Sequence, residues 1–256
     1  MENTQNLILV ANKLRKELLI KHSVSKMSHI GSDFSALDIM ISLYIDDILN
    51  ANDHFILSKG HAALGLYAVL HEKEIISDEL YSTLGKDGSV LGEHPIYGIE
   101  GIEVSTGSLG HGLSIAVGMA LAKNRNNEQG HIYVLLSDGE CQEGSTLEAM
   151  NFGARFKLNN ITAIVDSNRW QAFDRTILPV EKIKEEFLTA GWETVTINGH
   201  DYKELHDALS KKAEVPLLIL ANTILGKGVK SMEDKLEWHY KSPSEKEVKH
   251  FVEEIL

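Results

Sequence analysis

The sequence contains little cysteine and proline, no excess of positive charge and no long apolar run. Its 256 residues include one cysteine, so an internal disulfide is impossible, which is typical of proteins from a reducing compartment. Four prolines exclude a proline-rich linker protein. With 25 Lys and Arg against 37 Asp and Glu, the formal net charge is −12. That charge argues against nucleic acid and anionic membrane surfaces as partners.

Neither a membrane span nor a signal peptide is indicated. No segment approaches the roughly 20 uninterrupted apolar residues that a membrane-spanning helix needs. The first 19 residues, MENTQNLILVANKLRKELL, lack a basic region followed by an apolar block and a small-residue cleavage site. We therefore expect a cytoplasmic protein.

Short apolar runs alternate with helical patterns along the chain. Apolar residues recur at helical spacing from 7 to 18, and Ser35 is expected to cap a second helix. Strands are predicted at 54–58, 132–136, 161–165, 194–197 and 217–220. This alternation predicts an α/β fold, in which a parallel β-sheet is flanked by helices on both faces. We expect a single domain, 1–256, with a polar C-terminal extension from about 226.

Polar residues follow two of the predicted strands. In a parallel sheet the ligand site lies at the carboxyl ends of the strands. Asp138, in SDGECQEG, follows the strand 132–136, and Asn168, in VDSNRWQ, follows the strand 161–165. A carboxylate and an amide oxygen on adjacent strand ends suit Mg²⁺ or Ca²⁺, with phosphate oxygens completing the ligand set. The alternative is a polar turn in which Asp138 only caps the next helix.

Other polar residues carry weaker signals. A glycine-rich stretch, 85–112, is long for a loop, and loops of this kind are often functional. Cys141 has no base fixed beside it by the sequence, so a passive thiol is expected. Four histidines fall in helical patterns and are expected to be solvated: His22, His71, His206 and His250.

The motifs resemble those of transketolases. SDGECQEG followed by VDSNRWQ resembles the thiamine-diphosphate motif. Further transketolase-like segments occur in the same order, namely SKGH (58–61), GEHP (92–95), the stretch 104–122, and ILGKGVKSMED with WHYKSP (224–243). The resemblance covers only the first, diphosphate-binding domain of that family. It implies a split transketolase, whose pyrimidine-binding and C-terminal domains lie on a separate partner subunit in a heterotetramer.

The resemblance also implies roles for individual residues. The metal ligands would be Asp138, the Asn168 side chain and the Trp170 carbonyl oxygen. The implied cofactor-binding residues are His61, Gly107, Ser108, Leu109, Asp138, Gly139, Glu140, Asn168 and His239. The implied catalytic residues are His29, His61, His94 and His239. Glu143 would belong to a charged network between subunits. An unperturbed histidine pKa near ~6.5 suits proton transfer at sugar hydroxyls.

The implied activity is transfer of a two-carbon ketol unit from a ketose or ketose phosphate to an aldose or aldose phosphate. It would use thiamine diphosphate and Mg²⁺ (or Ca²⁺), and the isolated chain would be inactive. Two alternatives stay open: another thiamine-diphosphate reaction, such as that of 1-deoxyxylulose-5-phosphate synthase, and a non-catalytic cofactor-binding subunit. Ser137, Arg169 and Trp170 depart from the usual family pattern and motivate the second alternative. A generic nucleotide-binding fold is disfavoured because no Gly-x-Gly-x-x-Gly follows the first strand.

Overall fold

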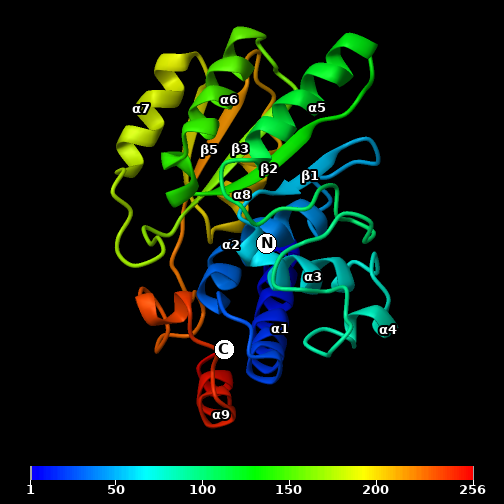
Figure 1. Cartoon of the computed structure of the whole chain (residues 1–256), viewed down its shortest axis with the longest axis vertical. Coiled ribbons are helices and arrows are strands. Elements are labelled where there is room, and N and C mark those ends of the chain that lie inside the picture. Colours follow the sequence, from blue (N-terminus) through cyan, green and yellow to red (C-terminus); the bar gives the residue numbers. More distant parts are fainter. Residues whose placement is uncertain (1, 256) are drawn as a thin grey trace.

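The computed structural model describes residues 2–255, and a parallel β-sheet forms its centre (Figure 1). The sheet has five strands in the order β1-β2-β3-β5-β4, and all neighbouring pairs are parallel. The strands are β1 (His54–Leu57), β2 (Ile132–Ser137), β3 (Ile161–Ser167), β4 (Glu193–Asn198) and β5 (Leu217–Asn222). The fold class and the five strands predicted from the sequence are confirmed.

Helices cover both faces of the sheet. The helices are α1 (Glu2–Ser25), α2 (Ile30–Tyr44), α3 (Ala63–Glu72), α4 (Asp78–Tyr81), α5 (Gly112–Asn126), α6 (Gly144–Arg155), α7 (Val180–Ala190), α8 (Tyr202–Leu209) and α9 (Glu245–Glu254). Three short 3₁₀ turns are η1 (Gly60–Ala62), η2 (Gly139–Gln142) and η3 (Leu236–His239). Helices α5, α6 and α7 contribute to one apolar core, and α1, α2, α3 and α8 contribute to the other.

The alternation of side chains along each strand supplies both cores. Val134 of β2 packs in the core beneath α5 and α6, whereas its neighbour Leu135 packs in the core beneath α2 and α3. Every residue of β2 and β3 is buried, which explains why these strands read as continuous apolar runs. The edge strand β4 is only partly buried and carries alternating polar residues.

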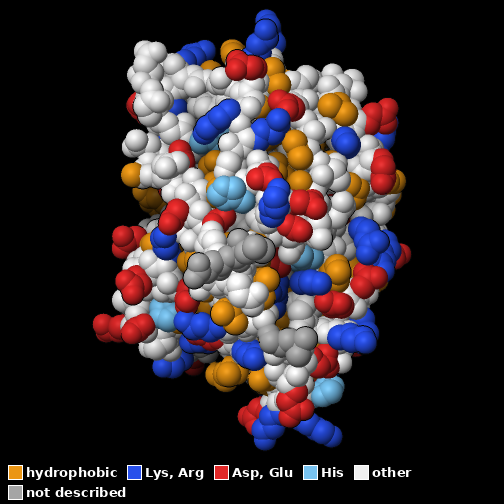
Figure 2. Space-filling view, turned by 180° about the vertical axis from the view of Figure 1, so that it is seen from behind, with side chains coloured by type: hydrophobic (Ala, Val, Ile, Leu, Met, Phe, Trp, Pro, Cys, Tyr) orange, Lys and Arg blue, Asp and Glu red, His pale blue; other side chains and the backbone are white. Residues whose placement is uncertain are grey.

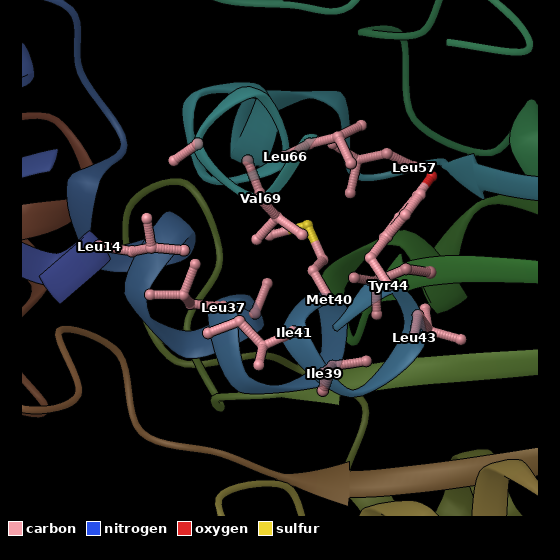
Figure 3. Packing of buried hydrophobic residues seen from close by; sticks show 14 of the residues in the cluster. Leu14, Leu37, Ile39, Met40, Ile41, Leu43, Tyr44, Leu57, Leu66 and Val69 are labelled. Carbon is pink, nitrogen blue, oxygen red and sulfur yellow. The ribbon is translucent and has the colours of Figure 1, made fainter. Parts of the chain in front are cut away.

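Helix α2 lies entirely inside the protein. All 15 of its residues are buried, and Leu37, Met40 and Ile41 pack against side chains from α1 and α3 (Figure 3). The predicted Ser35 cap was wrong, because α2 begins at Ile30, five residues earlier. A helix that is buried on all sides shows no polar face from which its start could be read.

Two predictions about single residues have opposite outcomes. His22 was expected to be solvated, but its side chain is fully buried between α1 and α2; His71, His206 and His250 keep 23%, 52% and 65% of their side-chain surface exposed. Cys141 is buried, and burial raises the pKa of its thiol well above the usual value, which confirms a passive thiol.

The surface mixes charges of both signs. Lys and Arg side chains lie interspersed with Asp and Glu side chains on the face seen in Figure 2. Within residues 2–255, no helix combines the length and the apolar character that a membrane span requires.

Candidate active site

A cavity of about 420 Å³ opens at the carboxyl ends of β1, β2 and β3. Its wall comes from segments far apart in the sequence: the turn before α2, η1, the glycine-rich loop, the β2–α6 turn, the segment after β3, and η3. The site therefore lies at the edge of the sheet where a parallel α/β fold places its ligands.

Asp138 and Asn168 are brought together by the pairing of β2 with β3. Ser137 lies opposite Asp166 in the register, so the residues that follow the two strands are neighbours. Asp138 Oδ1 accepts the Gly139 N–H at 2.8 Å, and Oδ2 accepts the Arg169 N–H at 2.7 Å. Burial, together with Asp166, raises the pKa of Asp138 to about 7.

The donor set at this point suits a divalent cation bound through oxygen. Asn168 is 3% exposed and lines the cavity, and its Oδ1 accepts the Trp170 N–H at 3.0 Å. Among residues 2–255, no cluster of three or more His, Cys, Asp or Glu side chains is arranged to hold a metal. A cation here would therefore depend on a carboxylate, an amide or carbonyl oxygen, and oxygens of its ligand, which is typical of Mg²⁺ with a phosphate.

Three histidine rings face one another across the cavity. The centroid of His29 lies 5.3 Å from that of His61 and 5.2 Å from that of His239, and the latter two are 5.9 Å apart. His29 precedes α2 in a left-handed conformation with φ of 69°. His239 Nδ1 is buried and has no hydrogen-bond partner among the described residues, so it is free to bond a ligand.

The histidines of this cluster are neutral at physiological pH. Burial lowers the pKa of His239 to about 4 and that of His61 well below the usual value, and Lys59 and the neighbouring rings lower both further. Burial also lowers the pKa of His29. The expected unperturbed pKa near ~6.5 was therefore wrong for these residues, because the cavity desolvates the rings and places them together.

The glycine-rich loop is joined to the β2–α6 turn. Glu140 Oε1 accepts the Gly110 N–H at 2.8 Å and the Ser58 hydroxyl group. Gly110 has φ of +86°, and a Cβ atom there would lie 2.4 Å from Ser145 Oγ. The loop can approach the turn this closely only with glycine at that position.

The segment after β3 forms another part of the wall. The Trp170 indole N–H donates to Asp234 Oδ1 at 2.9 Å, and the Arg175 guanidinium lies 3.6 Å above the indole ring. Arg175 also donates to both oxygens of Asp234, at 2.7 and 2.9 Å. The rim next to this wall carries Tyr240, whose ring stacks with that of Phe173 at 5.9 Å.

Comparison with known proteins gives the same result along the whole chain. Residues 17–255 match the family "Transketolase, thiamine diphosphate binding domain". The chain belongs to the transketolase family. It is 37% identical to one of the proteins that form the apulose-4-phosphate transketolase of Phocaeicola vulgatus, over 98% of this chain and 94% of that protein.

Two more transketolase relatives define the limits of the match. The 6-deoxy-6-sulfo-D-fructose transketolase subunit SqwG of a Clostridium species is 35% identical over 96% of this chain and 94% of its own length. The crystal structure of the transketolase from Campylobacter jejuni superposes with a TM-score of 0.87 at 29% identity. It covers 99% of this chain, which in turn spans only 42% of that transketolase.

The structure brings most of the candidate transketolase residues into one cavity. Those that line it are His29, His61, His94, Gly107, Leu109, Gly139, Asn168, Trp170 and His239. Ser108, Asp138 and Glu140 are not part of the lining. Asp138 lies directly beneath it, between Gly139 and Arg169, whereas Glu140 points to the glycine-rich loop, so a direct contact of Glu140 with the cofactor is not supported.

Sequence reasoning missed the polar network beneath the cavity. Asp166, on β3, accepts hydrogen bonds from Lys59, Ser35 and Thr223, and all four side chains are buried. Ser35 also accepts the Asn168 amide N–H at 3.2 Å, which turns the Asn168 oxygen away from Ser35. The signal was a lysine inside SKGH, directly after an apolar strand, where a solvated lysine is unexpected.

Proposed function

We propose that this chain is the diphosphate-binding subunit of a two-subunit transketolase. Such an enzyme transfers a two-carbon ketol unit from a ketose to an aldose. The observation that carries the proposal is the cavity that combines Asn168, with Asp138 beneath it, and the three facing histidines. The near full-length match to two proteins named as transketolase subunits supports the same proposal.

The residues present fit thiamine diphosphate with a divalent cation. Asp138, Asn168 and the Trp170 carbonyl oxygen would hold Mg²⁺, or Ca²⁺ in its place. Gly139 would lie against the diphosphate because a side chain there would meet Gln171 Cβ at 3.4 Å. When bound, thiamine diphosphate supplies a thiazolium carbon that becomes nucleophilic when it loses its proton.

The histidines would bind the remaining polar groups. His61 and His239 are neutral, so each can donate one N–H to a diphosphate oxygen and keep one nitrogen as an acceptor. His29 and His94 lie on the substrate side of the same cavity and would contact sugar hydroxyl groups. Gly107 and Leu109, which line the cavity, would lie beside the aminopyrimidine ring, with Ser108 between them.

Charges supplied by a partner chain would complete the site. None of the residues that line the cavity is Lys or Arg, and Glu143 is its one carboxylate in the described part of the chain. An anionic substrate group would therefore be bound by the partner, which would also carry the pyrimidine-binding domain. We expect a heterotetramer with two sites at subunit interfaces, in which Glu143 belongs to the network that joins them.

The substrate class follows from the relatives. The two transketolases named above act, by their names, on apulose 4-phosphate and on 6-deoxy-6-sulfo-D-fructose. Both compounds are sugars with an anionic group. We propose that the donor here is a ketose that carries a phosphate or a sulfonate.

The proposal is tested by reconstitution. The chain is mixed with a partner protein that carries the pyrimidine-binding and C-terminal domains, together with Mg²⁺, thiamine diphosphate and pairs of ketoses and aldoses. We expect two-carbon transfer by the mixture, none by either protein on its own, and none with Asp138→Ala. A control variant, His250→Ala on the exposed side of α9, should be fully active.

Other outcomes would contradict the proposal in distinct ways. Turnover of pyruvate with an aldehyde in place of a ketose would favour a synthase of the 1-deoxyxylulose-5-phosphate type. A stable complex that binds thiamine diphosphate in calorimetry but transfers nothing, with or without Asp138→Ala, would favour a non-catalytic cofactor-binding subunit.

A further inference from the structure

We propose that His22, which lies outside the cavity, is a positioning residue that holds both His29 and His239 in place. This inference rests on the proposed function, because it assigns a role to histidines of the candidate site. Its basis is a set of hydrogen bonds that meet at the carbonyl oxygen of Met27.

Both nitrogens of the His22 ring face oxygen atoms. Nδ1 lies 3.0 Å from the Met27 carbonyl oxygen, and Nε2 lies 2.7 Å from Asp33 Oδ2. A carbonyl oxygen only accepts, so Nδ1 carries a hydrogen and donates it to Met27. The second contact contains one proton between Nε2 and the Asp33 carboxylate. Because His22 and Asp33 are both fully buried, water cannot replace either bond.

The turn that His22 holds is the one that presents His29. It runs from the end of α1 to the start of α2, and both Lys26 and His29 have positive φ, at 60° and 69°. Residues other than glycine seldom adopt this conformation, so the turn needs bonds from outside itself. His22 supplies one of them, and Glu93 supplies another by accepting the Ser28 N–H at 2.7 Å.

The same carbonyl oxygen also anchors the segment that carries His239. The Ser242 hydroxyl group donates to the Met27 carbonyl oxygen at 2.6 Å, three residues after His239. Asp33 extends the link to a third element, because its Oδ1 accepts the Gly65 N–H of α3 at 2.7 Å. One buried imidazole therefore joins α1, α2 and the C-terminal segment behind two facing histidines whose rings are 5.2 Å apart.

Two substitutions separate the two bonds of His22. His22→Asn places an amide N–H near the position of Nδ1 and keeps the bond to Met27, whereas His22→Gln reaches toward Asp33 and loses the bond to Met27. A third variant, Ser242→Ala, removes only the second donor to the Met27 carbonyl oxygen. His131→Gln is the matched control, because His131 is a partly buried histidine, bonded to Thr162, at the opposite edge of the core from the turn.

The first measurement uses the chain without its partner. Ring ¹⁵N and ¹³C NMR signals of His29 and His239 report the position and environment of each ring directly. We expect His22→Gln to shift the signals of both rings, His22→Asn to shift them less, Ser242→Ala to shift those of His239 most, and His131→Gln to leave them unchanged. A merely structural role would lower the melting temperature in every variant and leave these signals in place.

The second measurement uses the reconstituted enzyme. Losing one hydrogen bond that orients His29 should raise KM for the ketose about 3- to 10-fold in His22→Gln, with a smaller change in His22→Asn. Equal effects of the two His22 variants on the signals and on KM would overturn the proposal, as would unchanged His29 signals in His22→Gln. If His22→Gln does not fold, unchanged His239 signals in Ser242→Ala would overturn it.

The two measurements keep this inference apart from the proposed function. Failure of every partner and substrate would count against the proposed function, whereas the NMR signals of the isolated chain would still decide the role of His22.

Discussion

The Lys59 ammonium group and the Asp166 carboxylate form an ion pair in which both side chains are completely buried. It lies beneath the point where β2 and β3 end, and Asp166 also accepts hydrogen bonds from Ser35 and Thr223. Two charges removed from water are tolerated only when each is paired and hydrogen-bonded. The pair thus places a fixed positive and a fixed negative charge directly below the proposed metal site.

Removing one member of this pair should destabilise the chain strongly. Lys59→Met leaves Asp166 buried without its counter-charge, and we expect it to lower the free energy of unfolding by about 3–5 kcal/mol. The double variant Lys59→Met/Asp166→Asn should lose less than the sum of the single variants, because no unpaired charge remains. Urea unfolding monitored by circular dichroism measures both. Additive losses would show that the two groups act independently.

Glu140 should act through the shape of the glycine-rich loop. Its Oε1 accepts the Gly110 N–H and the Ser58 hydroxyl group, whereas Oε2 is buried with no partner in the described part of the chain, and burial raises the pKa of the carboxyl. Glu140→Ala should cost about 1–3 kcal/mol of stability, since it leaves the Gly110 N–H unsatisfied. Glu140→Gln keeps the accepting oxygen and should cost less. Thermal unfolding compares the two, and equal losses would contradict this role.

The contact between Asp234 and Trp170 should affect cofactor binding more than stability. Asp234 is partly exposed, so its ion pair with Arg175 adds little to the free energy of unfolding. Asp234→Ala removes the acceptor of the Trp170 indole N–H, which fixes one wall of the cavity. We expect thiamine diphosphate with Mg²⁺ to bind about 2- to 10-fold more weakly to the reconstituted enzyme.

Calorimetry measures that affinity, and Asp207→Ala on the exposed face of α8 serves as the control. Equal affinities of the two variants would show that the Trp170 wall does not depend on Asp234.

Stability should fall when the pH is lowered from about 6.5 to about 4. Burial lowers the pKa of His131 to about 4, whereas an unfolded chain has a histidine pKa near ~6.5. In that window the unfolded chain binds a proton that the native chain does not, so acidification favours unfolding, by up to about 3 kcal/mol for His131. Above pH 6.5 this contribution is fully present and constant.

Urea unfolding at a series of pH values tests this expectation. His131→Gln should flatten part of the slope between pH 6.5 and 4, and the remainder should come from the other histidines of lowered pKa, including His239. His250→Gln, in the exposed part of α9, should leave the slope as it is. An unchanged slope in His131→Gln would show that this histidine is accessible to protons in the native state.

The sequence was sufficient for the fold because its signals were local. The apolar runs of β2 and β3 are buried on both faces and could be recognised without knowledge of their neighbours. The same runs also predicted that Asp138 and Asn168 would meet, since each follows a strand of one parallel sheet. The resemblance to transketolases, carried by motifs along the whole chain, was confirmed by the comparisons.

Only the tertiary structure decided which polar residues are buried and what they contact. Lys59, Asp166 and His22 lie in segments whose spacing does not distinguish a buried side chain from a solvated one, and their partners are up to 107 residues away in the chain. The lowered pKa values of His61 and His239 likewise depend on desolvation and on rings from distant segments. Apolar periodicity is a property of neighbouring residues, whereas the pairing of charges and the pKa of a group depend on what the folded chain brings next to it.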